Sequence, residues 1–249
     1  NADSDDVLGI DPFLFGFGFA ADGTATPLTW ENVISGELAA YPRVWLHLNR
    51  LSRQAQGWLY RKSGIDKVAV QSLLQEETRP RSTRHGHGFL INLRGVNLNA
   101  GEDLEDMIAL RMWASENMLI TLRSRRVQAA RDVEALIKAG EAPASTGGLV
   151  SALANALTDR MEPEIAAFDE HCDGYEDEIL DPDIRLGRAT LSEFRRKVLA
   201  LRRYIVPQRE ALSQLVREGT AAGFFTDTDV LYLRESVDRV TRLAEDLDA

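Results

Sequence analysis

Four carboxylates in the second half of the chain have the types and spacing that could hold a cation. They are Asp169, Asp173, Glu176 and Asp177. Spacing of i, i+4, i+7 and i+8 places them on one face of a helix, where stacked like charges repel by about a few tenths of a kcal/mol per pair. Either a basic partner helix or a bound divalent cation would offset this repulsion. The face is therefore a candidate metal contact, with the basic helix as the alternative.

A histidine and the single cysteine lie in the same acidic stretch. Imidazole and thiolate are both zinc ligands, so His171 and Cys172 join the candidate metal residues. Cys172 also falls on the apolar stripe of the predicted helix, and a small buried side chain is the simpler role for it.

A second pair of imidazoles occurs earlier, at His85-Gly-His87. At i and i+2 they would share one face of a strand and could supply half of a zinc site. No Cys or His partner stands nearby in the sequence. The plainer interpretation is a strand that enters a sheet, with glycines for close packing.

Catalytic motifs are missing from the sequence. It has no G-x-S-x-G, no glycine-rich phosphate loop, no H-E-x-x-H and no C-x-x-C. We therefore expect no enzyme and no cofactor. A metal-dependent hydrolase built on His85, His87 and the acids remains a further alternative.

Composition describes an ordinary globular protein, with 44% hydrophobic and 27% charged residues among 249. One cysteine excludes an intrachain disulfide and favours a reducing compartment. The acidic N-terminus lacks the basic region of a signal peptide, and the longest apolar run, at 13–21, is too short for a membrane helix.

The net charge is segregated: 159–183 carries −10 and 185–219 carries +6. Neither segment alternates bases with exposed aromatics, so nucleic acid binding is not expected.

The first half of the chain mixes short strand-like and helix-like runs. The predicted strands are 13–15, 44–48, 87–93, 107–114 and 118–122, and the predicted helices are 52–62 and 66–76. Three residues separate the last two strands, which predicts a hairpin. The fold class is therefore α/β, a mixed sheet with helices packed on it, assigned to a domain at 1–140.

After residue 126 the chain reads as helical, and a second domain is assigned to 141–249. A helix at 127–139 ends at Gly140, and a linker leads to a long helix at 149–179, in which Pro163 predicts a kink. After a turn, Thr190 and Glu193 form a capping box for a helix with a heptad seam from 191 to 215. The acidic and basic segments thus predict an antiparallel helical hairpin.

The last predicted helix, 230–247, shows no stop signal. Its final turn carries Glu245, Asp246 and Asp248, the unfavourable sign at a helix C-terminus. The apolar pattern of this helix therefore breaks off without the features that normally end a helix.

Three stretches in this order resemble the CorA family of divalent metal ion transporters, in particular its zinc-transporting ZntB branch. They are 93–127, with LRGVNLNAGEDLEDMIALRMWASENMLITLRSRRV, 196–219, with an internal R-x-x-x-P-Q pattern, and 231–249. The resemblance covers 85–249 well and the first 80 residues loosely.

The resemblance implies a homopentamer in the bacterial inner membrane, with this domain on the cytoplasmic side. The last predicted helix would be the first part of a long C-terminal stalk helix, which explains why it shows no stop signal. Five stalk helices would line a funnel and continue into the first of two transmembrane helices. The domain would set the oligomer geometry and the cation environment near the pore mouth, with Zn²⁺ or another divalent cation as the transported ion. The family's Gly-x-Asn signature would follow the first membrane helix, so the pore residues are not expected in this chain. Gly95-Val96-Asn97 follows a strand and is interpreted as coincidence.

A second function remains open from the residues alone. The seam at 191–215 and the stripe at 230–247 would also suit a soluble helical interaction or scaffold module that binds a partner.

Overall fold

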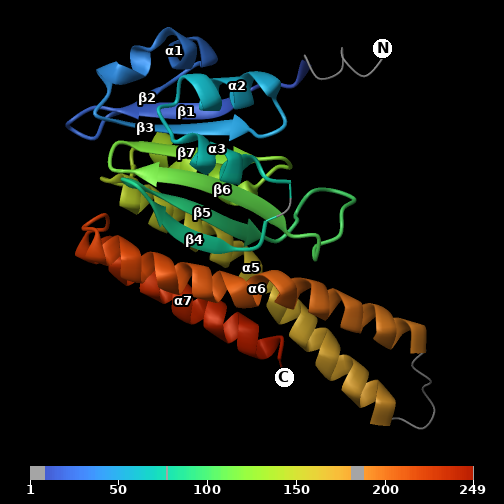
Figure 1. Cartoon of the computed structure of the whole chain (residues 1–249). Helices are drawn as coiled ribbons and strands as arrows, with labels where there is room; N and C mark the ends of the chain where they lie inside the picture. The colour runs from blue at the N-terminus through green and yellow to red at the C-terminus, as the bar shows by residue number, and fades with distance from the viewer. Residues whose placement is uncertain (1–8, 77, 181–187, 249) are drawn as a thin grey trace.

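A seven-stranded mixed sheet lies above three long helices (Figure 1). This computed structural model describes residues 9–76, 78–180 and 188–248, without the side chains at 169, 172–180 and 188. The strand order is β2-β1-β3-β7-β6-β5-β4. Only β3 and β7 pair in parallel among the described strand pairs, and the remaining pairs are antiparallel.

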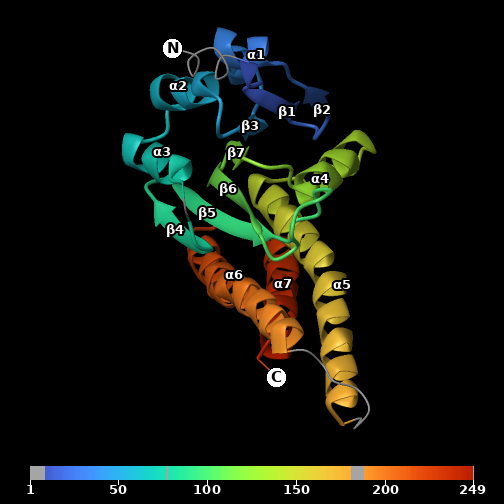
Figure 2. The ribbon, with the colours of Figure 1, turned by 90° about the vertical axis from the view of Figure 1, so that its right-hand side faces the viewer.

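The strands are short and apolar. They span β1 Phe13–Phe19, β2 Ala25–Pro27, β3 Arg43–Asn49, β4 Arg81–His85, β5 Gly88–Gly95, β6 Ile108–Ser115 and β7 Met118–Arg123. The sheet divides the core in two. One cluster packs α2 (Arg53–Arg61) and α3 (Lys67–Leu74) against Leu46, Trp113 and Ile120, and the other packs the four helices that follow β7 against the opposite face. Figure 2 shows these helix groups on either side of the sheet.

The helices lengthen toward the C-terminus. They are α1 Trp30–Ser35, the 3-10 helix η2 Glu37–Ala40, α2 Arg53–Arg61, α3 Lys67–Leu74, α4 Gln128–Lys138, α5 Thr146–Leu180, α6 Arg188–Ala221 and α7 Asp227–Asp246. Pro163 lies inside α5 and Pro207 inside α6. The turn expected at 181–187 lies outside the described residues.

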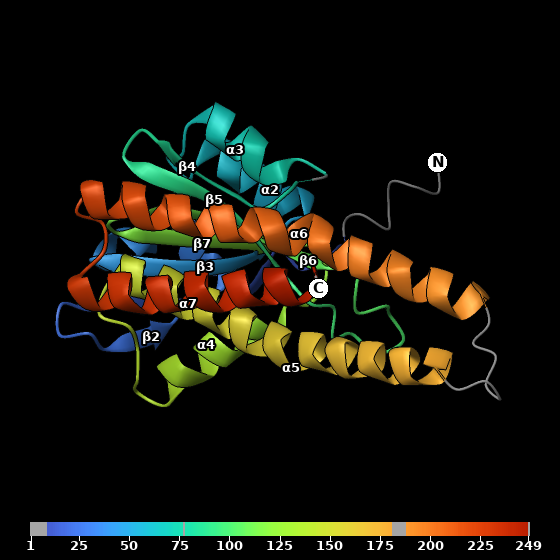
Figure 3. The same cartoon turned by 90° about the horizontal axis from the view of Figure 1, so that it is seen from below.

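Helix α7 lies in the groove between α5 and α6 and packs against both (Figure 3). Its buried stripe includes Leu233, Val240 and Leu243, at the spacing that the sequence predicts. Helices α5 and α6 also touch directly, where the rings of Phe168 and Phe194 lie 5.8 Å apart. The predicted hairpin is therefore a three-helix arrangement with the last helix as its centre.

The predicted fold class is confirmed, with one local correction. Residues 85–88 are not a continuous strand: β4 ends at His85, Gly86 has a φ of +58°, and β5 begins at Gly88, which pairs with His85. The two-residue turn requires a left-handed residue, which glycine adopts without strain. The prediction that both imidazoles extend from one strand face was therefore wrong.

Candidate functional site

The predicted acidic face falls at the far end of α5. The backbone of this stretch is helical, as predicted. The side chains of Asp169, Cys172, Asp173, Glu176 and Asp177 lie outside the part of the chain that is described. His171 is exposed, with its Nδ1 beside the carbonyl of Ala167 one turn earlier. Among the described residues, no group of three or more His, Cys, Asp or Glu side chains could hold a metal.

Acids nearer the start of α5 bind the last helix. The guanidinium of Arg239 in α7 donates from Nε to Glu162 Oε1 at 2.7 Å and from its second nitrogen to Glu162 Oε2 at 2.7 Å. It also reaches Asp159 Oδ1 at 2.5 Å. The hydrogen bonds from Arg239 lower the pKa of Glu162, and this pair in turn raises the pKa of Arg239. These acids are therefore neutralised by α7 rather than by the basic helix α6.

A groove opens where α7 ends. The cavity measures about 460 Å³. Its apolar walls come from α5 and α6, which extend beyond the end of α7 (Figure 3). The apolar lining is Ile165, Phe168, Phe194, Val198, Leu199 and Leu247. Arg202 on the rim pairs with Asp248 just after α7. The groove thus continues the surface between α5 and α6 on which α7 packs.

A buried glutamine fastens α6 to the sheet. Gln208 is 1% exposed and accepts a hydrogen bond from the backbone N–H of Arg94 at 2.6 Å. Its Nε2 donates to the Arg94 carbonyl at 3.0 Å. Strand β4 begins at Arg81, which pairs with Asn92, so it does not reach this part of β5. The side-chain amide therefore replaces the missing strand neighbour.

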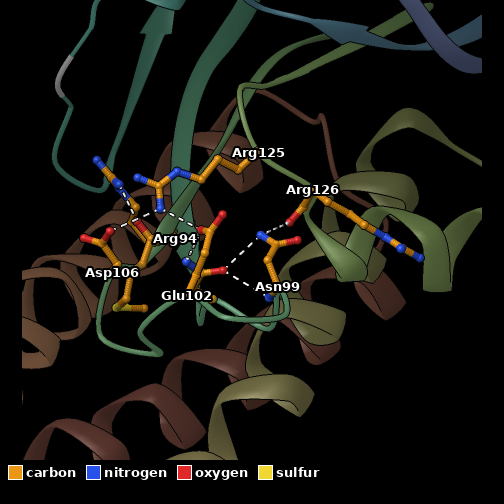
Figure 4. A network of polar contacts seen from close by, with 8 residues as sticks. Arg94, Asn99, Glu102, Asp106, Arg125 and Arg126 are labelled. Atoms are coloured by element: carbon orange, nitrogen blue, oxygen red, sulfur yellow. Dashed lines mark hydrogen bonds and ion pairs between the residues drawn. The ribbon is translucent and has the colours of Figure 1, made fainter.

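The loop between β5 and β6 is built from polar side chains (Figure 4). Asn97 is 3% exposed and donates to Glu102 at 2.7 Å, while its own oxygen accepts from the backbone and side chain of Asn99. Arg125 bridges the loop to the end of β7, at 3.0 Å from Glu102 and 3.2 Å from Asp106. Asn97 thus has a structural role where the strand ends, which agrees with its interpretation as unrelated to a membrane motif.

Arg94 connects this loop to α6. Its guanidinium donates to the carbonyls of Met107 and Thr78, both at 2.6 Å, and lies 4.4 Å from the ring centroid of Tyr204 in α6. A cation over an aromatic face is attracted by the ring quadrupole. Loop, sheet and α6 therefore meet at one residue.

The remaining histidines have packing roles. His85 and His87 both lie edge-on to Trp113, with ring centroids at 6.3 and 5.7 Å. His85 Nε2 also lies 3.2 Å from Asp66 Oδ1. His47 is 2% exposed inside β3, where its Nδ1 lies 2.7 Å from Thr121 Oγ1.

These contacts place the helices against an α/β sheet in an arrangement shared with known proteins. A family model described as CorA-like Mg²⁺ transporter protein matches residues 43–249. The chain belongs to the CorA family. The model match begins where β3 begins, so β1, β2, α1 and η2 lie outside it.

The chain is similar to two named transporters. The divalent cation transporter CmaX of Pseudomonas aeruginosa is 38% identical over 208 residues, which are 82% of this chain and 62% of CmaX. The zinc transport protein ZntB of Pectobacterium atrosepticum is 32% identical over 227 residues, which are 91% of this chain and 67% of that protein. The chain thus spans less than two thirds of CmaX. Both relatives are named as transporters rather than enzymes, as the sequence predicts for this family.

Solved structures agree on the fold. Full-length CmaX superposes with a TM-score of 0.86 at 33% identity, covering 96% of this chain and 74% of that one. The ZntB cytoplasmic domain of Vibrio parahaemolyticus gives a TM-score of 0.79 at 20% identity, covering 96% of this chain and 92% of that domain, and shares the fold. Within the described residues, none of the helices is both long and apolar enough to cross a bilayer.

Sequence reasoning missed the residues that join the elements. Gln208 was visible as the single polar position in the heptad seam, but its partner Arg94 is 114 residues away. Arg239 carried no signal beyond an ordinary surface arginine between apolar stripe positions.

Proposed function

We propose that this chain is the cytoplasmic domain of a bacterial inner-membrane divalent cation transporter, with zinc as the transported ion. Membership of the CorA family and the similarity to CmaX and ZntB support this proposal. The full protein would be a homopentamer, in which five copies of α7 line a funnel. The domain would set the geometry of that funnel and the cation environment near the pore mouth.

The position of α7 carries the proposal. The helix lies between α5 and α6, and the apolar groove of about 460 Å³ begins where it ends. A helix that continued along the same axis would cover Phe168, Phe194 and Val198, whose exposure to water is otherwise unfavourable. The groove therefore suits a stalk helix that proceeds toward a membrane.

The acidic end of α5 would concentrate cations near the stalk. Residues 159–183 carry a net charge of −10, and surfaces of one sign raise the local concentration of counter-ions. Asp169, Asp173, Glu176 and Asp177 are the proposed contacts, with His171 and Cys172 as weaker additions. Zinc calorimetry should show a heat change that is lost when the four acids become Asn or Gln. Equal heats for both proteins would remove this contact from the proposal.

The gene and the ion flux test the function directly. Reading the gene past the codon for Ala249 should reveal a continued heptad, followed by two apolar runs of about 20 residues each. The full protein in liposomes should then move Zn²⁺ into vesicles that contain a fluorescent zinc indicator, and competing Mg²⁺ should show which ion is preferred. A stop codon within a few residues would refute the transporter and favour the helical interaction module.

A further inference from the structure

A second cavity lies at the other end of the molecule, beside the N-terminal segment. It measures about 590 Å³, within the usual range for small-molecule sites. One wall comes from α1, η2 and Tyr41, and the other from α2, the start of β3 and the β6–β7 turn. The first wall lies outside the residues matched by the CorA family model, which begins at 43. The cavity therefore depends on a part of this chain that the family model does not contain.

A single formal charge faces this cavity. Of its lining residues, all of which are described, Lys62 alone is charged. Its ammonium group donates to the carbonyl of Ile34 at 3.1 Å, which fixes it near the end of α1. An ammonium has three donors, so two more hydrogen bonds are available for a ligand.

Aromatic and apolar side chains form much of the remaining surface. Trp58 is 5% exposed, and its Nε1 donates to the Val33 carbonyl at 3.3 Å, which fixes the indole plane. Tyr41 is half-buried, and Met118 and Leu38 add further apolar surface. Such walls favour a flat apolar group over a strongly hydrated one.

The side-chain amide of Asn117 adds a second donor to the lining. Asn117 Oδ1 accepts from the hydroxyl of Ser115 at 3.3 Å, and within the described residues its Nδ2 is left for a ligand. The hydroxyls of Ser35 and Ser63 donate to the carbonyls of Asn32 and Leu59, at 3.3 and 2.6 Å. The hydrogens of these two hydroxyls are therefore already used, and the donors that remain for a ligand are the Lys62 ammonium and the Asn117 amide, which suit an anion.

We propose that this cavity binds a small aromatic carboxylate. The carboxylate lies against the Lys62 ammonium and the Asn117 amide, and the ring lies against Trp58 and Tyr41. A charge-assisted hydrogen bond supplies the selectivity for the anion, and burial of the ring supplies most of the affinity.

The site is connected to the long helices by hydrogen bonds. The carbonyl of Glu116, next to Asn117, accepts from Thr146 Oγ1 at the start of α5, at 2.8 Å. Ser145 Oγ then donates to Asp229 Oδ2 in the first turn of α7, at 3.1 Å. A ligand that orders the β6–β7 turn therefore acts beside the hydrogen bonds that hold the starts of α5 and α7. This is a suitable position for a site through which a bound ligand influences the long helices.

Titration with 4-phenylbutyrate tests the proposal, with its neutral amide as the matched control ligand. Two-dimensional NMR of the ¹⁵N-labelled chain follows the Trp58 indole signal, assigned by Trp58→Phe, and the backbone amides of Asn117 and Met118. We expect saturable shifts with the carboxylate, and about tenfold weaker binding of the amide, since one charge-assisted contact contributes about 1.4 kcal/mol.

Variants separate the charge from the fold. Lys62→Gln keeps a donor for Ile34 and should weaken carboxylate binding about tenfold, and Lys62→Arg should restore most of it. Lys67→Gln, at an exposed lysine outside the cavity, should leave binding unchanged. Equal affinity for carboxylate and amide, or shifts that do not include Trp58 and Asn117, would overturn the proposal. None of these outcomes depends on ion transport.

Discussion

His47 is a neutral base that the fold keeps away from water. Burial, with nearby Arg123 and Arg131, lowers the pKa of His47 from 6.5 to about 3. Above about pH 6.5 the imidazole is neutral in both the folded and the unfolded chain, so its ionisation does not change the free energy of unfolding. Between 6.5 and about 3 the unfolded chain binds a proton that the folded chain does not, and stability falls as the pH falls.

His47→Asn isolates this effect. Asn keeps a polar group near the position of Nδ1, which contacts Thr121, but it does not titrate. Between about pH 7.5 and about pH 4.5, the wild type should lose about 2 to 3 kcal/mol more unfolding free energy than the variant. Urea unfolding at both pH values measures the difference. The same loss in both proteins would show that other groups carry the acid sensitivity.

Gln208 should be among the most sensitive polar positions. Gln208→Leu keeps the volume but leaves the N–H and C=O of Arg94 without their partner, which costs about 2 to 4 kcal/mol in unfolding free energy. Gln214→Leu is the control, because Gln214 is half-buried and its side chain donates to Glu218, one turn further along α6. Urea unfolding should show a change below about 1 kcal/mol for the control. Similar losses for both variants would mean that the hydrogen bonds between Gln208 and Arg94 add nothing to the packing of α6.

At the scale of elements, Arg239 holds α7 to α5. A double-mutant cycle of Arg239→Gln and Glu162→Gln should give a coupling free energy of about 1 to 2 kcal/mol, since the paired guanidinium is largely buried, at 14% exposed. The pair Arg217 and Glu210 is the control, with both side chains more than half exposed and 3.4 Å between their nearest atoms. Its coupling should stay below about 0.5 kcal/mol. If the coupling between Arg239 and Glu162 were as small as that of the control pair, this ion pair would not be what holds α7 to α5.

The sequence predicted the longer elements well and the shorter ones poorly. The strands that contain Trp45 and Trp113 and the four C-terminal helices were all visible, because apolar periodicity persists through them. Strand β2 has three residues and α1 has six, too few for a period to show. Strand β4 was missed because its sequence, Arg81 to His85, is polar. It is an edge strand that α6 covers, so its burial depends on a helix more than 100 residues later.

The candidate site was less predictable, for a related reason. Periodicity identifies which face of α7 is buried, but not which helices bury it. The acidic and basic segments suggested that α5 and α6 pair. Instead α7 lies between them, and its Arg239 donates hydrogen bonds to Asp159 and Glu162 in α5. Such pairings depend on the angle between helices, which charge patterns do not encode.

At the scale of the whole molecule, one apolar cluster joins the sheet to the helices. It contains sheet residues such as Phe89 and Leu110 together with Leu153, Leu212 and Leu233 from α5, α6 and α7. Calorimetry should therefore show a single cooperative transition, with equal calorimetric and van't Hoff enthalpies. Two separate transitions would instead support independent domains at 1–140 and 141–249, a division that stays a prediction.

The parallel pairing of β3 with β7 has a consequence for how the chain reaches its native state. Strands β4 to β7 follow one another in the sheet as they do along the chain, so they can assemble by local hairpins. Strand β3 must wait for a partner 74 residues later, as His47 and Thr121 illustrate. Closing so long a loop is slow and costs entropy before any contact forms. During synthesis, the first three strands would therefore remain unattached until β7 has emerged, and the sheet would close last along its parallel seam.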